Sequence, residues 1–272
     1  MAATLEQVRA EFLAKLTDAG TDSADAKALL DVARPALIFR PAASAIESDP
    51  SRINRPDGAT NEDDIPIGAT KIGGRPDVPA GFSWPGTQSF VLQFDLAKLP
   101  PDVIDLDLPR QGHLLFFADP EEPTRGTLMW IEPDHTRLQR TEPPEDAILF
   151  LPRRMIRDIM LTLDLNRSEV PAFDAREDEV YSAIAVPDAS ECIQLGGDAQ
   201  TLSDDKTLYC EEAAGDPPDD LPEEDQEWRL VMRVGSIEEC EMAWGQSLFV
   251  WLRAGDLRAR RFENAVVLQL AE

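Results

Sequence analysis

Apolar residues in the first forty positions follow the period of an amphipathic helix. The positions that recur at this spacing are Leu5, Val8, Phe12 and Leu16. Thr4 and Gln7 match a capping box at the start of this helix, and Gly20 is a stop signal. Residues 22–33 predict a second helix that Pro35 ends, and 37–39 predict a short strand.

From residue 67 onward the apolar positions take the period of strands. Alternation over 90–96 and 228–234 is typical of half-buried strands. Shorter apolar runs predict further strands at 114–117, 128–131, 148–151, 248–252 and 266–268. Met155, Ile156, Ile159, Met160 and Leu163 have helical spacing and predict a helix over 153–165, and 256–262 predicts a short one. Strands that outnumber helices without alternating with them predict an α+β fold with a β-rich, mixed or antiparallel sheet core.

The same pattern suggests how the chain is divided. We expect an N-terminal helical segment over 1–40, a loop or linker over 41–66 and an α+β domain over 67–272. Within that domain Gly73-Gly74 and then Trp84 precede two strands, and Gly196-Gly197 and then Trp228 precede two more. This echo predicts an internal duplication with halves at about 67–165 and 180–272; chance similarity between β-rich stretches is the alternative.

Composition limits the partners. The 272 residues include 26 Lys and Arg against 52 Asp and Glu, a net charge of −26. Such a charge repels nucleic acids and anionic membranes and favours a basic partner, although acidity that only maintains solubility is the alternative. Nine acids and no base over 211–227 predict a solvated loop. With no apolar run of membrane-spanning length and no secretory signal at Met1, we expect a soluble, cytoplasmic protein.

No residue pattern predicts a catalytic or metal site. His113 and His135 are the two histidines and lack the spacing of a metal-binding pair. The cysteines, Cys192, Cys210 and Cys240, are widely spaced and odd in number, so we expect three reduced thiols. Gly73-Gly74 does not match a nucleotide-binding loop. We therefore expect no cofactor and no metal.

Arginines and tryptophans are the remaining candidates for binding. Two basic clusters interrupt the acidic chain, and their members are Arg153, Arg154 and Arg157 in the first and Arg258, Arg260 and Arg261 in the second. Pairing with the protein's own acids is the favoured interpretation, and anion binding is the alternative. Trp84, Trp228 and Trp251 adjoin apolar strands, so we expect them to be buried.

Several ordered motifs carry a family resemblance. The stretch GATKIGGRPDVPAGFSWP at 68–85 is followed by FVLQFDLAKLP and GHLLFFADP, then by LGGDAQTLSDD, WRLVMRVGS, WGQSLFVWL and GDLRARRFENAVVL. Over roughly 67–270 the chain resembles the bacterial YwqG-like family, whose function is unassigned. It departs from that family at Ser203-Asp204-Asp205, where a Gln-Gly-Asp step is usual. The resemblance implies an α+β fold with internal duplication and implies no reaction.

Without a catalytic pattern, we expect a non-catalytic intracellular binding module for a protein, for which the net charge favours a basic one, or for a small polar ligand. The ligand-binding candidates are Gly73, Gly74, Arg75, Gly196, Gly197, Asp198 and Trp244. Because glycines permit close approach, we expect the two glycine pairs to meet and to border a pocket. The alternative is a hydrolase-type enzyme between the halves, with Asp95 or Asp198 as base and an arginine as anion clamp.

Overall fold

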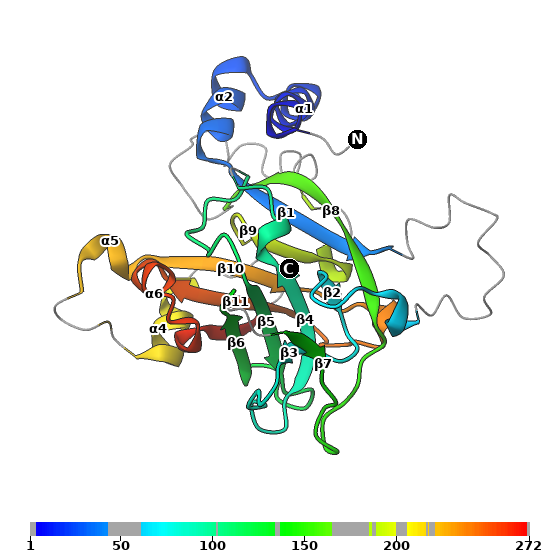
Figure 1. Ribbon diagram of the computed structural model, residues 1–272. Coiled ribbons are helices and arrows are strands. Elements are labelled where there is room, and N and C mark those ends of the chain that lie inside the picture. The colour runs from blue at the N-terminus through cyan, green and yellow to red at the C-terminus, as the bar shows by residue number, and fades with distance from the viewer. Residues whose placement is uncertain are drawn as a thin grey trace, which may run out of the picture.

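The computed structural model describes residues 4–42, 61–101, 103–133, 137–164, 185–186, 189–199, 206–215, 217 and 221–270. Its first elements are the helices α1 (Leu5–Asp18) and α2 (Ser23–Val32), which lie together at one end of the molecule (Figure 1). The capping box at α1 is confirmed, since the Thr4 hydroxyl accepts from the Gln7 backbone N–H and the Gln7 side chain accepts from the Thr4 N–H.

Ten strands form one sheet in which every neighbouring pair is antiparallel, in the order β12-β11-β10-β9-β1-β8-β2-β4-β5-β6. Their bounds are β1 Arg34–Pro41, β2 Lys71–Ile72, β4 Ser89–Asp95, β5 His113–Ala118, β6 Gly126–Ile131, β8 Arg153–Thr162, β9 Ile193–Gly196, β10 Trp228–Val234, β11 Ser247–Arg253 and β12 Val266–Leu270. A separate pair is formed by β3 (Asp77–Pro79) and β7 (Leu138–Arg140).

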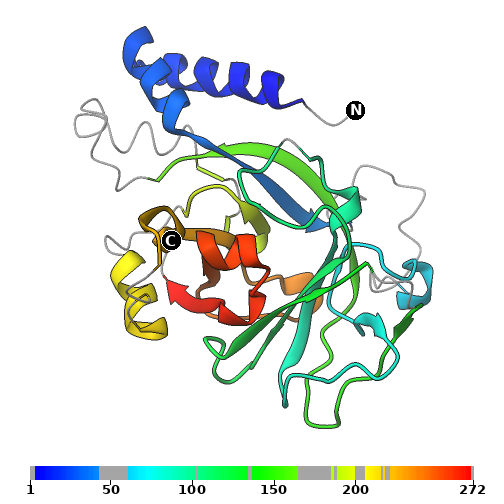
Figure 2. The same ribbon diagram turned by 60° about the vertical axis from the view of Figure 1, so that its left-hand side comes forward.

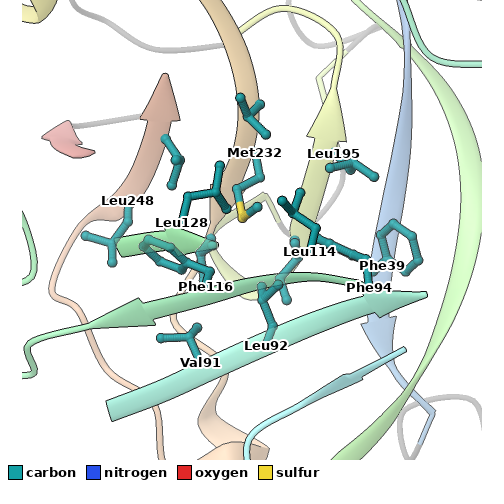
Figure 3. Close-up of a cluster of buried hydrophobic side chains, with 14 of the residues drawn as sticks. Phe39, Val91, Leu92, Phe94, Leu114, Phe116, Leu128, Leu195, Met232 and Leu248 are labelled. Carbon is teal, nitrogen blue, oxygen red and sulfur yellow. The ribbon is translucent and has the colours of Figure 1, made fainter. Parts of the chain in front are cut away.

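The large sheet curls until its two edge strands, β6 and β12, approach each other (Figure 2). Where they meet, a Cβ added to Gly126 would lie 2.7 Å from Cγ2 of Val267, so only glycine fits. The curled sheet encloses the main core, in which Phe39, Phe94, Leu114 and other apolar side chains point toward one another from β1, β4 and β5 (Figure 3).

The strands beside this core are covered on their outer face as well. Phe117 of β5 packs outward against Trp84 at a ring-centroid distance of 5.2 Å. On the other half, Trp251 of β11 packs outward in a cluster with Cys210 of α4 (Lys206–Ala214). Burial on both faces explains why residues 114–117 form an unbroken apolar run instead of an alternating one.

The strand order is symmetric about the central pair β1 and β8. On one side lie β9, β10, β11 and β12, and on the other β2, β4, β5 and β6. Both sides have a register irregularity at the same place, between Phe90 and Leu92 in β4 and between Leu230 and Met232 in β10. A duplication would produce such an order, but the predicted one, with halves at about 67–165 and 180–272, stays a prediction, and β1 lies outside both of those halves.

The predicted α+β class is wrong, because a ten-stranded antiparallel sheet dominates the architecture of the described residues, which form a β-rich fold. The largest single error is the helix predicted over 153–165, which is the strand β8. On one face Met155 and Ile159 pack on the main core, while on the opposite face Met160 packs in a separate cluster with Ala36 and Ile38. Apolar residues on both faces of one strand therefore gave the spacing of a helix.

Smaller elements also differ from prediction. The predicted strand at 148–151 is irregular chain, in which Ile148 is 52% exposed. The acidic stretch 211–227 was predicted as a loop, but its described part includes the end of α4 and the short α5 (Glu223–Gln226). The short helix predicted at 256–262 is α6 (Ala254–Ala259). Among the described residues no helix is long and apolar enough to cross a membrane.

Candidate functional site

The two glycine pairs form tight turns after β2 and β9. All four glycines have positive φ angles, +63° and +70° for Gly73 and Gly74 and +72° and +75° for Gly196 and Gly197. A Cβ added to Gly73 would lie 2.3 Å from the Leu151 carbonyl oxygen, so neighbouring chain also excludes a side chain there. Both backbone conformation and close packing therefore require glycine at these turns.

These turns do not meet, and the expectation that they border one pocket is wrong. β1 and β8 lie between β2 and β9, and the three antiparallel pairings put the ends of β2 and β9 at opposite ends of the sheet. Of the other candidates, Trp244 is buried against Phe150 at 5.6 Å. Asp198 lies beside Gly197, where its backbone N–H donates to Thr162 Oγ1 at 2.7 Å and its carboxylate pairs with Arg34 at 3.6 Å.

Arg75, the last of these candidates, belongs to a buried ionic network. Its backbone N–H and Nε donate to the two carboxylate oxygens of Glu62 at 2.6 and 2.8 Å. These bonds hold the pKa of Glu62 below its ordinary value even though burial acts in the opposite direction. Arg75 also pairs with Glu142, and the two carboxylates raise the pKa of its guanidinium.

The centre of this network is the fully buried Lys71–Asp77 pair, with Nζ 3.5 Å from Oδ1. Burial lowers the pKa of Lys71. Asp77 accepts from the Gly68 N–H and the Gln93 amide, each at 2.9 Å, and pairs with Arg140 at 3.2 Å. Because the hydrogen-bonding groups are paired with one another, the network fixes the 61–77 segment against β4 and β7 and leaves little capacity for a ligand.

Beside that segment lies a cavity of about 770 Å³, here called the β8 cavity. It is bounded by β8, by the segment before β2, and by the adjoining ends of β4 and β5. Its lining residues are Phe39, Ala42, Pro66, Ile67, Gly68, Ala69, Thr70, Asp95, Lys98, His113, Leu138, Arg154, Met155, Ile156 and Arg157. The volume is within the range of small-molecule sites, roughly 300–1,000 Å³.

Three cations in the β8 cavity have no carboxylate partner among the residues that the structure describes. The Arg154 guanidinium and the Lys98 ammonium group make no hydrogen bond or ion pair with any residue that the structure describes. Arg157 donates to the Lys98 carbonyl oxygen and has no carboxylate partner within the described ranges. The one carboxylate in the lining, Asp95, accepts from the Ala97 N–H at 3.1 Å.

The second basic cluster behaves differently. Arg258, Arg260 and Arg261 pair with Asp225, Asp107 and Asp256, respectively. Self-pairing is therefore confirmed for this cluster. In the first cluster Arg153 is 4% exposed and turned into the protein, while Arg154 and Arg157 remain available at the cavity.

His113 also lines the β8 cavity, opposite Asp95 in the β4–β5 pairing. Its Nε2 lies 2.9 Å from the Gly68 carbonyl oxygen. Since a carbonyl oxygen only accepts, this contact places a proton on Nε2 and leaves Nδ1 as the acceptor of the neutral ring. Asp95 is oriented through its own backbone N–H, which donates to Thr70 Oγ1 at 2.9 Å. His135 lies outside the described residues.

A second cavity of about 760 Å³ adjoins Trp228 and Arg253. The Arg253 guanidinium stacks on the Trp228 ring at 4.8 Å and donates to the Gly215 carbonyl. Trp228 is half-buried, as is Trp84, whereas Trp251 is buried as predicted. Arg261 and Asp256 in this cavity pair with each other, so it offers fewer free groups than the β8 cavity.

The three cysteines are buried and none of them forms a disulfide, as predicted. Burial raises the pKa of Cys210 and of Cys240 to about 12 each. Thiols that remain protonated at neutral pH are poor nucleophiles, so neither cysteine has the environment of a catalytic thiolate.

A comparison with family models finds a match over residues 70–269 to the family described as "Domain of unknown function (DUF1963)". The match covers most of the chain, and the chain belongs to this family. A search of curated proteins gives no match. The matched range begins after β1, although β1 lies at the centre of the sheet between β9 and β8.

Proposed function

We propose that the protein is a binding module for a small anionic ligand and that the β8 cavity is its site. The main observation in support is that Lys98, Arg154 and Arg157 line one cavity without a carboxylate partner among the described residues. In a chain with 52 acids against 26 bases, cations are easily neutralised internally, so a group left free is informative. Of the two occupants predicted from sequence, the cavity favours the small ligand over a basic protein.

The symmetry of the sheet supports this choice of site. Where both halves need the same turn, both have a glycine pair, which supports a structural role for those glycines. The charged and polar residues of the cavity have no such counterparts. When the two halves are matched by their strand registers, Asp95 corresponds to Gly235, His113 to Ser247 and Arg154 to Ile38. Residues that only one half needs are candidates for function rather than for folding.

The finer family assignment belongs to the same proposal. We infer that the chain is a YwqG-like member of its family, on the ordered motifs from GATKIGG to the C-terminal strand. That assignment adds no reaction, and the proposal of anion binding rests on the cavity alone.

A hydrolase is the second candidate, and one observation favours it. Asp95 and His113 are cross-strand neighbours that share the cavity with the free arginines. A histidine with a free Nδ1 can accept a proton from water, and an arginine can stabilise the anionic intermediate of ester hydrolysis. The site proposed between the glycine pairs is no longer available to this hypothesis.

Calorimetric titration with inorganic phosphate, sulfate, acetate and citrate at low ionic strength tests the proposal. We expect at least one of these anions to bind, and Arg154→Gln to weaken that binding about tenfold, as loss of a charge-assisted contact does. Arg9→Gln is the matched control, because Arg9 is exposed on α1, far from the cavity lining. Equal weakening in both variants would mean that only the net charge matters, and the site would be wrong.

A further inference from the structure

The β8 cavity has an apolar side as well as a basic one. Large apolar side chains that remain exposed are few among the described residues: Ile67, Ile148, Leu149, Ile156, Leu208 and Tyr209. Ile67 and Ile156 both line the β8 cavity, where they are 51% and 39% exposed. Phe39, Leu138 and Met155 continue this apolar side.

These apolar groups are held in place. Ile67 lies next to Gly68, whose N–H donates to buried Asp77 at 2.9 Å, and follows Ile65, whose carbonyl accepts from Arg140 at 2.7 Å. Ile156 is fixed on β8 by its pairing with Arg40. The exposure of these isoleucines therefore belongs to a rigid surface rather than to a loosely packed loop, and covering them costs little conformational entropy.

The basic and apolar groups are interleaved on one strand. Arg154, Ile156 and Arg157 lie within four consecutive residues of β8, and all three line the cavity. A simple inorganic anion would contact the arginines and leave both isoleucines in water. A ligand with an anionic head and a hydrocarbon body would satisfy the cations and remove apolar surface from water at the same time.

We propose that the ligand class of the β8 cavity is an amphiphilic organic anion, a carboxylate or phosphate monoester with an aliphatic body. This inference rests on the proposed function and specifies its ligand. The arginines hold the head group, and Ile67 and Ile156 contact the body.

A homologous series of linear carboxylates, from acetate through hexanoate to decanoate, tests the inference by calorimetry on the full chain. We expect affinity to rise roughly three- to fourfold per methylene group until the apolar side is covered, as transfer of hydrocarbon from water predicts. The corresponding alcohols report the apolar contribution without the charge. A parallel series of alkyl phosphates tests whether the head group can be a phosphate.

Two kinds of variant separate the head from the body. Arg154→Gln should reduce carboxylate affinity toward that of the alcohols and leave the dependence on chain length unchanged. Ile67→Asn and Ile156→Asn should flatten that dependence and leave acetate binding unchanged. Leu149→Asn is the matched control, because Leu149 is 51% exposed outside the cavity lining.

Each outcome is decisive for one of the two proposals. Anion binding that depends on Arg154 but not on chain length would overturn the amphiphile and retain the anion site. Affinity that rises equally for acids and alcohols and ignores Arg154 would overturn the proposed function. No binding by any member of either series would overturn both.

Discussion

Lys71 and Gln194 make equivalent hydrogen bonds in the two halves of the sheet. Each lies two residues before a glycine pair, and each donates from its side chain to the carbonyl oxygen four residues further on, Lys71 Nζ to Arg75 and Gln194 Nε2 to Asp198. Both side chains are fully buried. A buried donor that closes the turn thus accompanies each glycine pair, and the unit as a whole is a turn element.

That relationship predicts that the glycine pairs stabilise the fold and do not bind ligand. Gly197→Ala should lower the free energy of unfolding by about 2 kcal/mol or more, because a positive φ is costly for alanine and its Cβ would lie 2.3 Å from Thr162 Oγ1. Urea titration measures the change, and anion affinity of the folded variant should be unchanged.

Gly81→Ala is the matched control for this variant. Gly81 has a φ of +81° but has no atom within 4 Å of an added Cβ, so it isolates the backbone cost of about 1 kcal/mol. Equal destabilisation by the two substitutions would show that close packing at Gly197 is unimportant.

The buried network predicts an acid-sensitive contribution to stability. The pKa of Glu62 in the folded protein is below its ordinary value of 4.5, so folding favours the ionised form. Its contribution is fully present above pH 4.5 and is lost as the pH falls through the lowered folded-state pKa. Glu62→Gln should remove this contribution and cost about 3 kcal/mol at pH 7, because Lys71 and Arg75 lose a buried partner.

Urea titrations of both proteins between about pH 7 and pH 3 measure that effect. The difference in stability between wild type and Glu62→Gln should shrink as the pH falls. A difference that stays constant over this range would mean that the charge of Glu62 does not stabilise the network. Asp119→Asn, at an exposed turn, is a control for removal of one acid.

Local patterns were sufficient to predict much of the fold. Sequence alone located three elements, because their patterns depend on contacts between residues close together in the chain. These patterns are the capping box and apolar spacing of α1, the alternation of β10 and the apolar run of β5. β8 was missed because its apolar residues lie on both faces of the strand, with Met155 and Ile159 against the main core and Met160 in a separate cluster on the other face. Only the tertiary arrangement distinguishes that pattern from a helix.

Local patterns indicated only a small part of the candidate site. Its residues come together through strand registers, Phe39 beside Arg157 and Asp95 beside His113, which depend on contacts distant in sequence. The one local signal was the Arg153–Arg157 cluster, for which anion binding was the less favoured interpretation. The glycine pairs drew attention because glycine is required there, but the requirement is that of a turn.

The cysteines should be unreactive in the native protein. Because burial raises the pKa of Cys210 and Cys240 to about 12, almost no thiolate is present at neutral pH, and all three thiols are shielded from reagent. Iodoacetamide at pH 7.5 should label no cysteine before unfolding and three after it, as measured by mass spectrometry. Rapid labelling of one native thiol would reveal a reactive site that its burial does not predict.

Removing the carboxylate of the β8 cavity should strengthen anion binding. Asp95→Asn leaves an acceptor oxygen for the Ala97 N–H and removes the one negative charge among the described lining residues, so an anionic ligand loses a repulsive neighbour. We expect affinity for the anion that binds wild type to increase about two- to fivefold at low ionic strength, with a smaller increase at high salt. Asp119→Asn is the matched control, since Asp119 also accepts from nearby backbone N–H groups but lies outside the lining.

Asp95→Asn also separates the two candidate functions. A binding module gains affinity and has no turnover to lose, whereas a hydrolase that uses Asp95 as base would lose ester hydrolysis, measured with nitrophenyl esters. Unchanged or weakened anion affinity would contradict the electrostatic account of the cavity.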